Sequence, residues 1–220
     1  MADKIDIGYQ IHEFAKKLWP INRSITGKGL RETLHLISNE LPGLKINSIN
    51  SNELAFDWII PQEWEVNEAY IIDPSGQKIC DFRENNLHLV GYSIPFEGTI
   101  SLDELQNHLY SDDVLPDAVP YVTSYYAPIW GFCISKNERE KLISGNYKVV
   151  VKTRLFDGEL NWGEIIIPGQ STKEVFLSTY VCHPSMANNE LSGPCILTFL
   201  AKWLLGEKNL EYTYRIAFVP

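Results

Sequence analysis

The chain has 220 residues, of which 45% are hydrophobic, and a formal net charge of −9 at pH 7. This composition is sufficient for a folded core, and the negative charge argues against nucleic-acid binding. No apolar run reaches the length of a membrane span, and the first ten residues, MADKIDIGYQ, do not read as a signal peptide. We therefore expect a cytoplasmic protein without a nucleic-acid or membrane partner. The four cysteines are far apart and lie mostly in apolar runs, which predicts buried free thiols.

The N-terminal region predicts two helices. One begins near Ile7 and is ended by Pro20, and the other is capped by Thr26 or Gly27 and ended by Pro42-Gly43. Between them lies Arg23, in a turn-rich loop with neighbouring hydroxyl groups. Its guanidinium could bind the carboxylate or phosphate of a substrate, or it could be a solvated arginine beside a helix cap. The sequence leaves both interpretations open.

The middle of the chain predicts mostly short strands. The alternation of Leu54, Phe56, Trp58 and Ile60 is typical of a half-buried strand. Residues 65–155 then predict a hairpin around 73–76, strands over 86–93 and 147–151, and short helices with capping boxes that start at Ser101 and Ser135. Aromatic residues are dense from Tyr121 to Cys133, and core packing is a better interpretation of them than a stacking platform. This block reads as an inserted β-rich domain.

The last part of the chain alternates strands and helices, which indicates an α/β sheet. The pattern predicts strands over 160–168, 175–181 and 212–219, and a helix from Ser192 to Leu205. The domains are thus predicted as residues 1–64 with 156–220, interrupted by 65–155.

The candidate functional residues lie in the loop after the strand 175–181, at the carboxyl end of the strand, where open α/β sheets place ligands. This loop contains His183, Asn189 and Glu190. Because a neutral imidazole is the commonest metal ligand, His183 is a candidate metal ligand, although it could equally form only hydrogen bonds within the loop. The adjacent Cys182 could be a nucleophile, but no third group that would orient it is visible.

These residues resemble a known family. A strand that ends in a histidine, followed by acidic or amide residues and then by Leu-Ser-Gly at the start of an apolar helix, resembles the dizinc aminopeptidases of the M28 type. The stretch CHPSMANNELSGP (182–194) is more closely similar to bacterial aminopeptidase-like proteins built from the domains of unknown function DUF4910 and DUF2172. Other stretches that carry the resemblance are WPINRSITGKGLRETL (19–34), FDWIIPQEW (56–64), NNLHLVGYSIP (85–95) and PYVTSYYAPIWGFC (120–133).

The resemblance implies a zinc-exopeptidase (phosphorylase/hydrolase-like) α/β sheet with helices on both faces and an inserted DUF2172-like domain. It implies one or two zinc ions, with His183 and either Glu190 or Asn189 as ligands. It also implies hydrolysis of an amide or peptide bond, in a small peptide or in an amide-bearing sugar of surface-polysaccharide biosynthesis. The catalytic glutamate and later ligands of the family would lie beyond Pro220, so no catalytic residue is expected within the chain.

Two departures from the M28 pattern leave alternatives open. Asn189 occupies the position of the aspartate that bridges two metals, so that Glu190 takes this role, or the site holds one metal, or it holds none. Ser185 occupies the position of the aspartate that orients the histidine. A non-catalytic binding or scaffold module on an aminopeptidase fold is therefore the alternative. A sheet that stops at Val219 would also have an open edge, which could lead to self-association.

Overall fold

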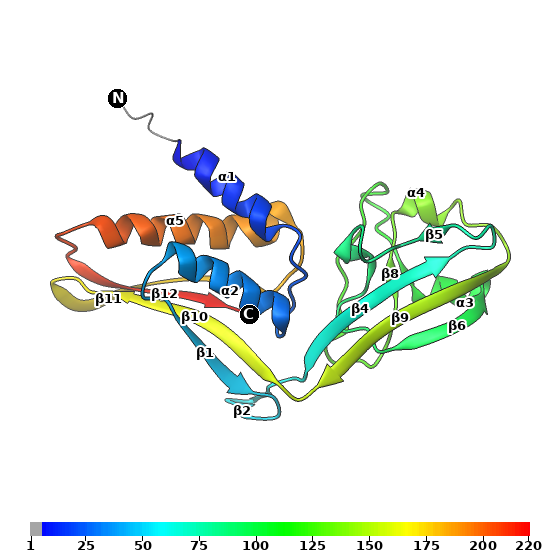
Figure 1. The fold of residues 1–220 in the computed structure, drawn as a ribbon, viewed down its shortest axis with the longest axis horizontal. Coiled ribbons are helices and arrows are strands. Elements are labelled where there is room, and N and C mark those ends of the chain that lie inside the picture. Colours follow the sequence, from blue (N-terminus) through cyan, green and yellow to red (C-terminus); the bar gives the residue numbers. More distant parts are fainter. Residues whose placement is uncertain (1–5) are drawn as a thin grey trace. The chain divides into compact units, whose positions relative to one another are not determined.

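The computed structural model describes residues 6–220, which form two compact units (Figure 1). The first unit combines residues 6–63 with 157–220, and the second consists of residues 64–156. All four cysteines are buried and free. Over residues 6–220, no helix is both long enough and apolar enough to cross a membrane.

The first unit is built on a four-stranded mixed sheet with the strand order β1-β10-β12-β11. β1 pairs with β10 and β10 with β12 in antiparallel fashion, whereas β11 and β12 are parallel and are connected through helix α5. The predicted alternation of strands and helices in this part of the chain is confirmed. Its elements are α1 (Ile7–Leu18), α2 (Lys28–Glu40), β1 (Lys45–Asn50), β2 (Leu54–Ala55), β3 (Trp58–Ile59), β10 (Glu159–Ile167), β11 (Ser171–Tyr180), the π-helical turn η3 (Ala187–Leu191), α5 (Ser192–Gly206) and β12 (Tyr212–Val219).

Local sequence explains where the two N-terminal helices begin. The Asp6 side chain caps α1 by accepting a hydrogen bond from the Gly8 backbone N–H. α2 begins after Gly27, whose φ of 95° lies in the region that glycine adopts without strain. Most of the apolar stripe of each helix is buried or partly buried, and both stripes meet the sheet and α5 in one hydrophobic core.

The helices of the first unit cover one face of its sheet. α1, α2 and α5 lie on the same side of the strands (Figure 1), and Ile165, Ile216 and Leu177, which are neighbours across three strands, belong to this core. On the opposite face, Ile166 and Phe176 flank Arg215, and 61% of Phe176 is exposed. The prediction of helices on both faces is therefore wrong for the described residues, because all three apolar helix surfaces pack into a single core.

The predicted strand over residues 54–60 is a tight hairpin instead. β2 and β3 pair through only two residues each, and Phe56 lies in the turn between them with a φ of 57° and 99% of its surface exposed. The alternating apolar residues of 54–60 therefore do not form one buried face of a strand. The sheet strand in this region is β1, which lies earlier in the chain and has only a partly buried pattern, so its sequence gives little signal.

The second unit is mostly β-structure, with the sheet order β5-β4-β9-β6 and a small β7-β8 pair. Ser101 and Ser135 cap their short helices as predicted, each accepting a hydrogen bond from the N–H three residues later. The predicted strand over residues 86–93 is wrong, because its first residues form a 3₁₀ helix. The elements are β4 (Glu63–Ile72), β5 (Lys78–Ile79), η1 (Asn86–His88), β6 (Phe96–Ser101), α3 (Leu102–Leu105), η2 (Gln106–His108), β7 (Leu109–Tyr110), β8 (Phe132–Cys133), α4 (Lys136–Arg139) and β9 (Asn146–Phe156).

The aromatic segment of the second unit contributes to its core. Trp130 is buried and stacks on both Phe96 and His108, with ring centroids 4.3 and 3.7 Å away. Phe132 is also buried. His88 and His108 each direct Nδ1 to a backbone carbonyl oxygen, at 2.8 and 3.1 Å. These contacts support core packing over a stacking platform.

Candidate metal centre

His183 follows the parallel strand β11 directly. The backbone N–H of Val181 donates to the carbonyl of Val219 at 2.8 Å, which is the last sheet hydrogen bond before the chain turns away. Cys182 and His183 then lie at the carboxyl end of the strand, facing the turn that leads into α5. This is the position at which α/β sheets place ligands, as the sequence predicted.

The turn before α5 determines which side chains face His183. Glu190 and Leu191 both donate their backbone N–H to the carbonyl of Met186, at 2.9 and 3.3 Å, which makes η3 a π-helical turn. In this turn Glu190 is fully buried, whereas Asn189 is exposed. Turns of this kind are frequent at functional sites, because they redirect one side chain without ending the helix.

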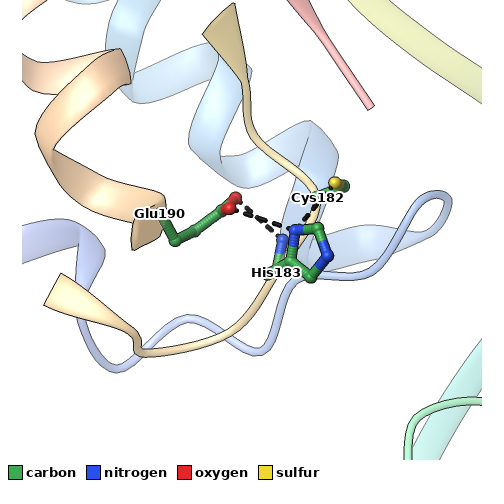
Figure 2. Close-up of side chains that lie close together, drawn as sticks. All are labelled: Cys182, His183 and Glu190. Carbon is green, nitrogen blue, oxygen red and sulfur yellow. Dashed lines mark hydrogen bonds and ion pairs between the residues drawn. The ribbon is translucent and has the colours of Figure 1, made fainter. Parts of the chain in front are cut away.

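Glu190 holds His183 through both of its carboxylate oxygens (Figure 2). Oε1 accepts from the His183 backbone N–H at 2.8 Å, and Oε2 lies 3.1 Å from the ring nitrogen Nδ1. The Cys182 sulfur lies 3.0 Å from the same nitrogen. Ligand atoms of these three residues lie within 4.8 Å of one another, and the imidazole is the most accessible of the three, with 26% of its side chain exposed.

Arg23 is buried against the backbone of His183, so it is not the solvated arginine that the sequence also allowed. It is only 2% exposed, and it donates Nε to the carbonyl of His183 at 2.9 Å and Nη1 to the carbonyl of Leu18 at 2.6 Å. Its remaining nitrogen, Nη2, is buried without a hydrogen-bond partner in the described part of the chain. Burial lowers the pKa of Arg23, and the charge of Glu190 opposes that shift. This placement does not support the expectation that Arg23 binds a substrate.

Cys182 is not set up as a nucleophile. Burial, followed by the nearby charge of Glu190, raises the pKa of its thiol to about 12. The thiol is therefore protonated near neutral pH, and a protonated thiol is a poor nucleophile.

Asn189 is held on the outer side of the turn. Its backbone oxygen and its side-chain oxygen lie 3.0 and 3.3 Å from the hydroxyl of Tyr180, which donates to them. The ring of Tyr180 also packs edge-on against His183, with centroids 5.6 Å apart. The sequence analysis did not single out Tyr180. The one available signal was an aromatic residue with a hydroxyl at the end of the strand before His183.

The donor set fits part of a single zinc site. Imidazole nitrogen and carboxylate oxygen are donors that zinc accepts, but catalytic zinc usually has three protein ligands. In residues 6–220, both oxygens of Glu190 are hydrogen-bonded to His183, and Asn189 offers an uncharged amide. An amide carries no charge with which to bridge two cations, so the described residues do not form a complete two-metal site.

The fold is that of aminopeptidase-like peptidases. A crystal structure of a protein from Clostridium acetobutylicum that is named as a peptidase superposes with a TM-score of 0.92 at 42% identity, over 97% of this chain and 50% of that one. A zinc aminopeptidase from Bacillus subtilis superposes with a TM-score of 0.62 at 12% identity, over 96% and 60% of the two chains. A peptidase M28 precursor from Shewanella amazonensis gives 0.58 at 12% identity, over 96% and 66%. At 12% identity, the likeness concerns the fold alone.

The chain belongs to the DUF4910 family, a domain of unknown function whose model matches residues 12–220. A curated Clostridium acetobutylicum protein is 42% identical over 215 residues, and its name assigns it to polysaccharide biosynthesis with an aminopeptidase-like domain. The match covers 98% of this chain and 49% of that protein, so the chain spans about half the length of this relative. The resemblance seen in the sequence is thereby confirmed.

Proposed function

We propose that this chain forms part of the site of a metal-dependent, aminopeptidase-like hydrolase of an amide or peptide bond. The observation that carries the proposal is the partly exposed imidazole of His183 at the carboxyl end of β11, backed by a buried carboxylate, on an aminopeptidase-like fold. His183 would be a ligand of a zinc ion, and a second donor would come from the adjacent Asn189–Glu190 pair. A bound zinc ion polarises a carbonyl group and lowers the pKa of a bound water.

The other residues around His183 would keep the site ready to bind. Glu190 and Arg23 hold the histidine backbone from both sides, and Tyr180 fixes the outer face of the turn at Asn189. The name of the curated relative favours a substrate in polysaccharide biosynthesis, so an amide on a sugar is as suitable a candidate as a small peptide.

We also propose that residues 64–156 are a domain inserted into the aminopeptidase-like unit. Both ends of the insertion are anchored in the first unit. Arg31 forms two hydrogen bonds to Glu63, at 2.7 and 2.9 Å, and Asp157 accepts one from Gln62 at 2.9 Å. Anchored ends of this kind would allow the second unit to be present without disturbing the sheet.

A zinc titration tests the proposed function. We expect the purified chain to bind zinc, and His183→Ala to weaken this binding at least about tenfold. His35→Ala is the matched control, because His35 is an exposed histidine on α2 of the same unit. Zinc binding that survives His183→Ala unchanged would refute a metal site at His183, and zinc binding that is absent would refute a metal site completed by residues 6–220 alone.

The second candidate function is a non-catalytic binding module on this fold. The observation that favours it is Asn189, whose amide oxygens accept from Tyr180 and bring no charge to the site. Absence of zinc binding, together with a folded chain, would favour this alternative.

A further inference from the structure

His183 is held at three separate polar points. Its backbone N–H donates to Glu190 Oε1 at 2.8 Å, its ring Nδ1 lies 3.1 Å from Glu190 Oε2, and its carbonyl accepts from Arg23 Nε at 2.9 Å. Arg23 comes from the loop between α1 and α2, and Glu190 comes from the turn before α5. Two buried, oppositely charged side chains from distant parts of the chain therefore converge on one partly exposed imidazole.

The chemistry of these contacts fixes the position of the ring proton. Oε1 of the Glu190 side chain accepts from the backbone N–H, and the matching role for Oε2 is to accept from Nδ1, so the geometry points to a hydrogen on Nδ1. The thiol of Cys182 is only a weak donor and cannot compete with a charged acceptor for this nitrogen. In the resulting tautomer, Nε2 carries the lone pair, and Figure 2 shows this nitrogen on the side of the ring away from Glu190.

The same contacts occupy Glu190. Its two oxygens each face a nitrogen of His183, and the residue is fully buried. A metal bound directly to Glu190 would have to displace one of these hydrogen bonds inside the protein. The buried charge of Glu190 is offset by the nearby guanidinium of Arg23, which is itself 2% exposed.

We propose that Glu190 and Arg23 form a buried frame that sets the orientation and the tautomer of His183, with Glu190 as a positioning residue and not a metal ligand. The frame leaves Nε2 of His183 on the side of the ring that faces away from Glu190. Glu190 thereby takes the orienting role for which Ser185 is too weak an acceptor, from a position five residues further along the chain. The use of Nε2 for metal binding rests on the proposed function, whereas the tautomer itself does not.

The direct test is the tautomer of His183 in the metal-free protein. Long-range ¹H–¹⁵N spectra of ¹⁵N-histidine-labelled chain, recorded at a pH where imidazole is neutral, distinguish a protonated from an unprotonated ring nitrogen. His183→Ala identifies the signals, since the chain contains five histidines. We expect a protonated Nδ1 and an unprotonated Nε2. A wild-type His183 protonated at Nε2 would overturn the proposal without any need for a variant.

The substitution Glu190→Gln provides a second test of the tautomer of His183. The backbone N–H of His183 needs an acceptor, so the glutamine oxygen takes the place of Oε1 and its NH₂ group faces Nδ1. Nδ1 must then accept, and the proton moves to Nε2. Glu190→Asp keeps a carboxylate and should keep the Nδ1–H tautomer. Glu207→Gln is the matched control, because it makes the same change at an exposed glutamate after α5. An unchanged tautomer in folded Glu190→Gln would contradict the frame.

Zinc addition separates this proposal from the proposed function. Zinc that binds with retention of the Nδ1–H signal supports both, and Glu190→Gln should then weaken binding about ten- to hundredfold. Loss of the Nδ1–H signal on zinc binding would mean that the metal sits among Cys182, His183 and Glu190, which overturns the positioning role. Failure of the chain to bind zinc would count against the proposed function alone, since the tautomer is measured without metal.

Discussion

Replacing Gly193 by alanine tests whether the first turn of α5 must lie against β11. A methyl carbon at position 193 would lie 2.3 Å from Oγ1 of Thr179 but 3.5 Å from its Cβ, so the clash is with the hydroxyl alone. Overpacking of this kind costs about 1–3 kcal/mol, and alanine returns up to about 1 kcal/mol of helix propensity. We expect Gly193→Ala to destabilise the first unit by about 1–2 kcal/mol.

Thr179→Ala provides the second half of a double-mutant cycle. It removes the clashing hydroxyl, so Gly193→Ala in this background should be neutral or slightly stabilising, with a coupling energy of about 1–3 kcal/mol. Gly206→Ala, at the other end of α5, has no atom within 4 Å of the added carbon and should be harmless.

Hydrogen exchange of α5 and β11 peptides, combined with urea unfolding, measures the effect of Gly193→Ala, and peptides from residues 64–156 serve as an internal reference. Equal destabilisation of both backgrounds by Gly193→Ala would refute the close-approach argument.

Three further predictions follow from buried groups. Glu63→Gln should reduce the free energy of unfolding by about 2–3 kcal/mol in urea titrations, because it removes the carboxylate that is hydrogen-bonded to Arg31 and weakens the acceptor of the Glu159 backbone N–H. Burial raises the pKa of Cys133 from 9.0 to about 12, so the folded state binds a proton that the unfolded state releases, and stability should fall as the pH rises from about 9. Cys133→Val should make this fall of stability with pH less steep. An unchanged dependence of the free energy of unfolding on pH would contradict the role of Cys133. A thiol reagent should label all four buried cysteines at rates that follow unfolding, as mass spectrometry of partly labelled chains can show.

Much of the fold was predictable because its signals are local. The apolar stripe of α1, the glycine at the start of α2 and the serine caps of α3 and α4 depend on neighbouring residues, and the structure contains each of them. The secondary-structure predictions that were wrong failed because distant parts of the chain decide the structure there. β1 is a strand because β10 pairs with it, and Phe56 is an exposed turn residue although its spacing matches a buried strand. Tertiary pairing decided both cases against the local pattern.

The site was predictable only in part, for the same reason. The position of His183 follows from a strand that ends at a loop, which a sequence displays. The role of Arg23 does not, since 160 positions separate it from the carbonyl that it binds. The direction of Glu190 depends on the π-helical turn at residues 187–191, which places it inward and Asn189 outward. No periodicity rule distinguishes that turn from an ordinary loop.

This turn suggests how a histidine site can lose two expected carboxylates and remain organised. If the resemblance to the M28 pattern holds residue by residue, Ser185 and Asn189 stand where that pattern has an orienting and a bridging aspartate, and one carboxylate, Glu190, is still present beside the histidine. A bridging carboxylate must face two metals, whereas an orienting carboxylate must face the imidazole nitrogen that does not bind the metal. The geometry of Glu190 matches the second requirement, since both oxygens face His183. On this argument, orientation of the histidine is retained in this chain, and it is the bridging charge that is absent from residues 6–220.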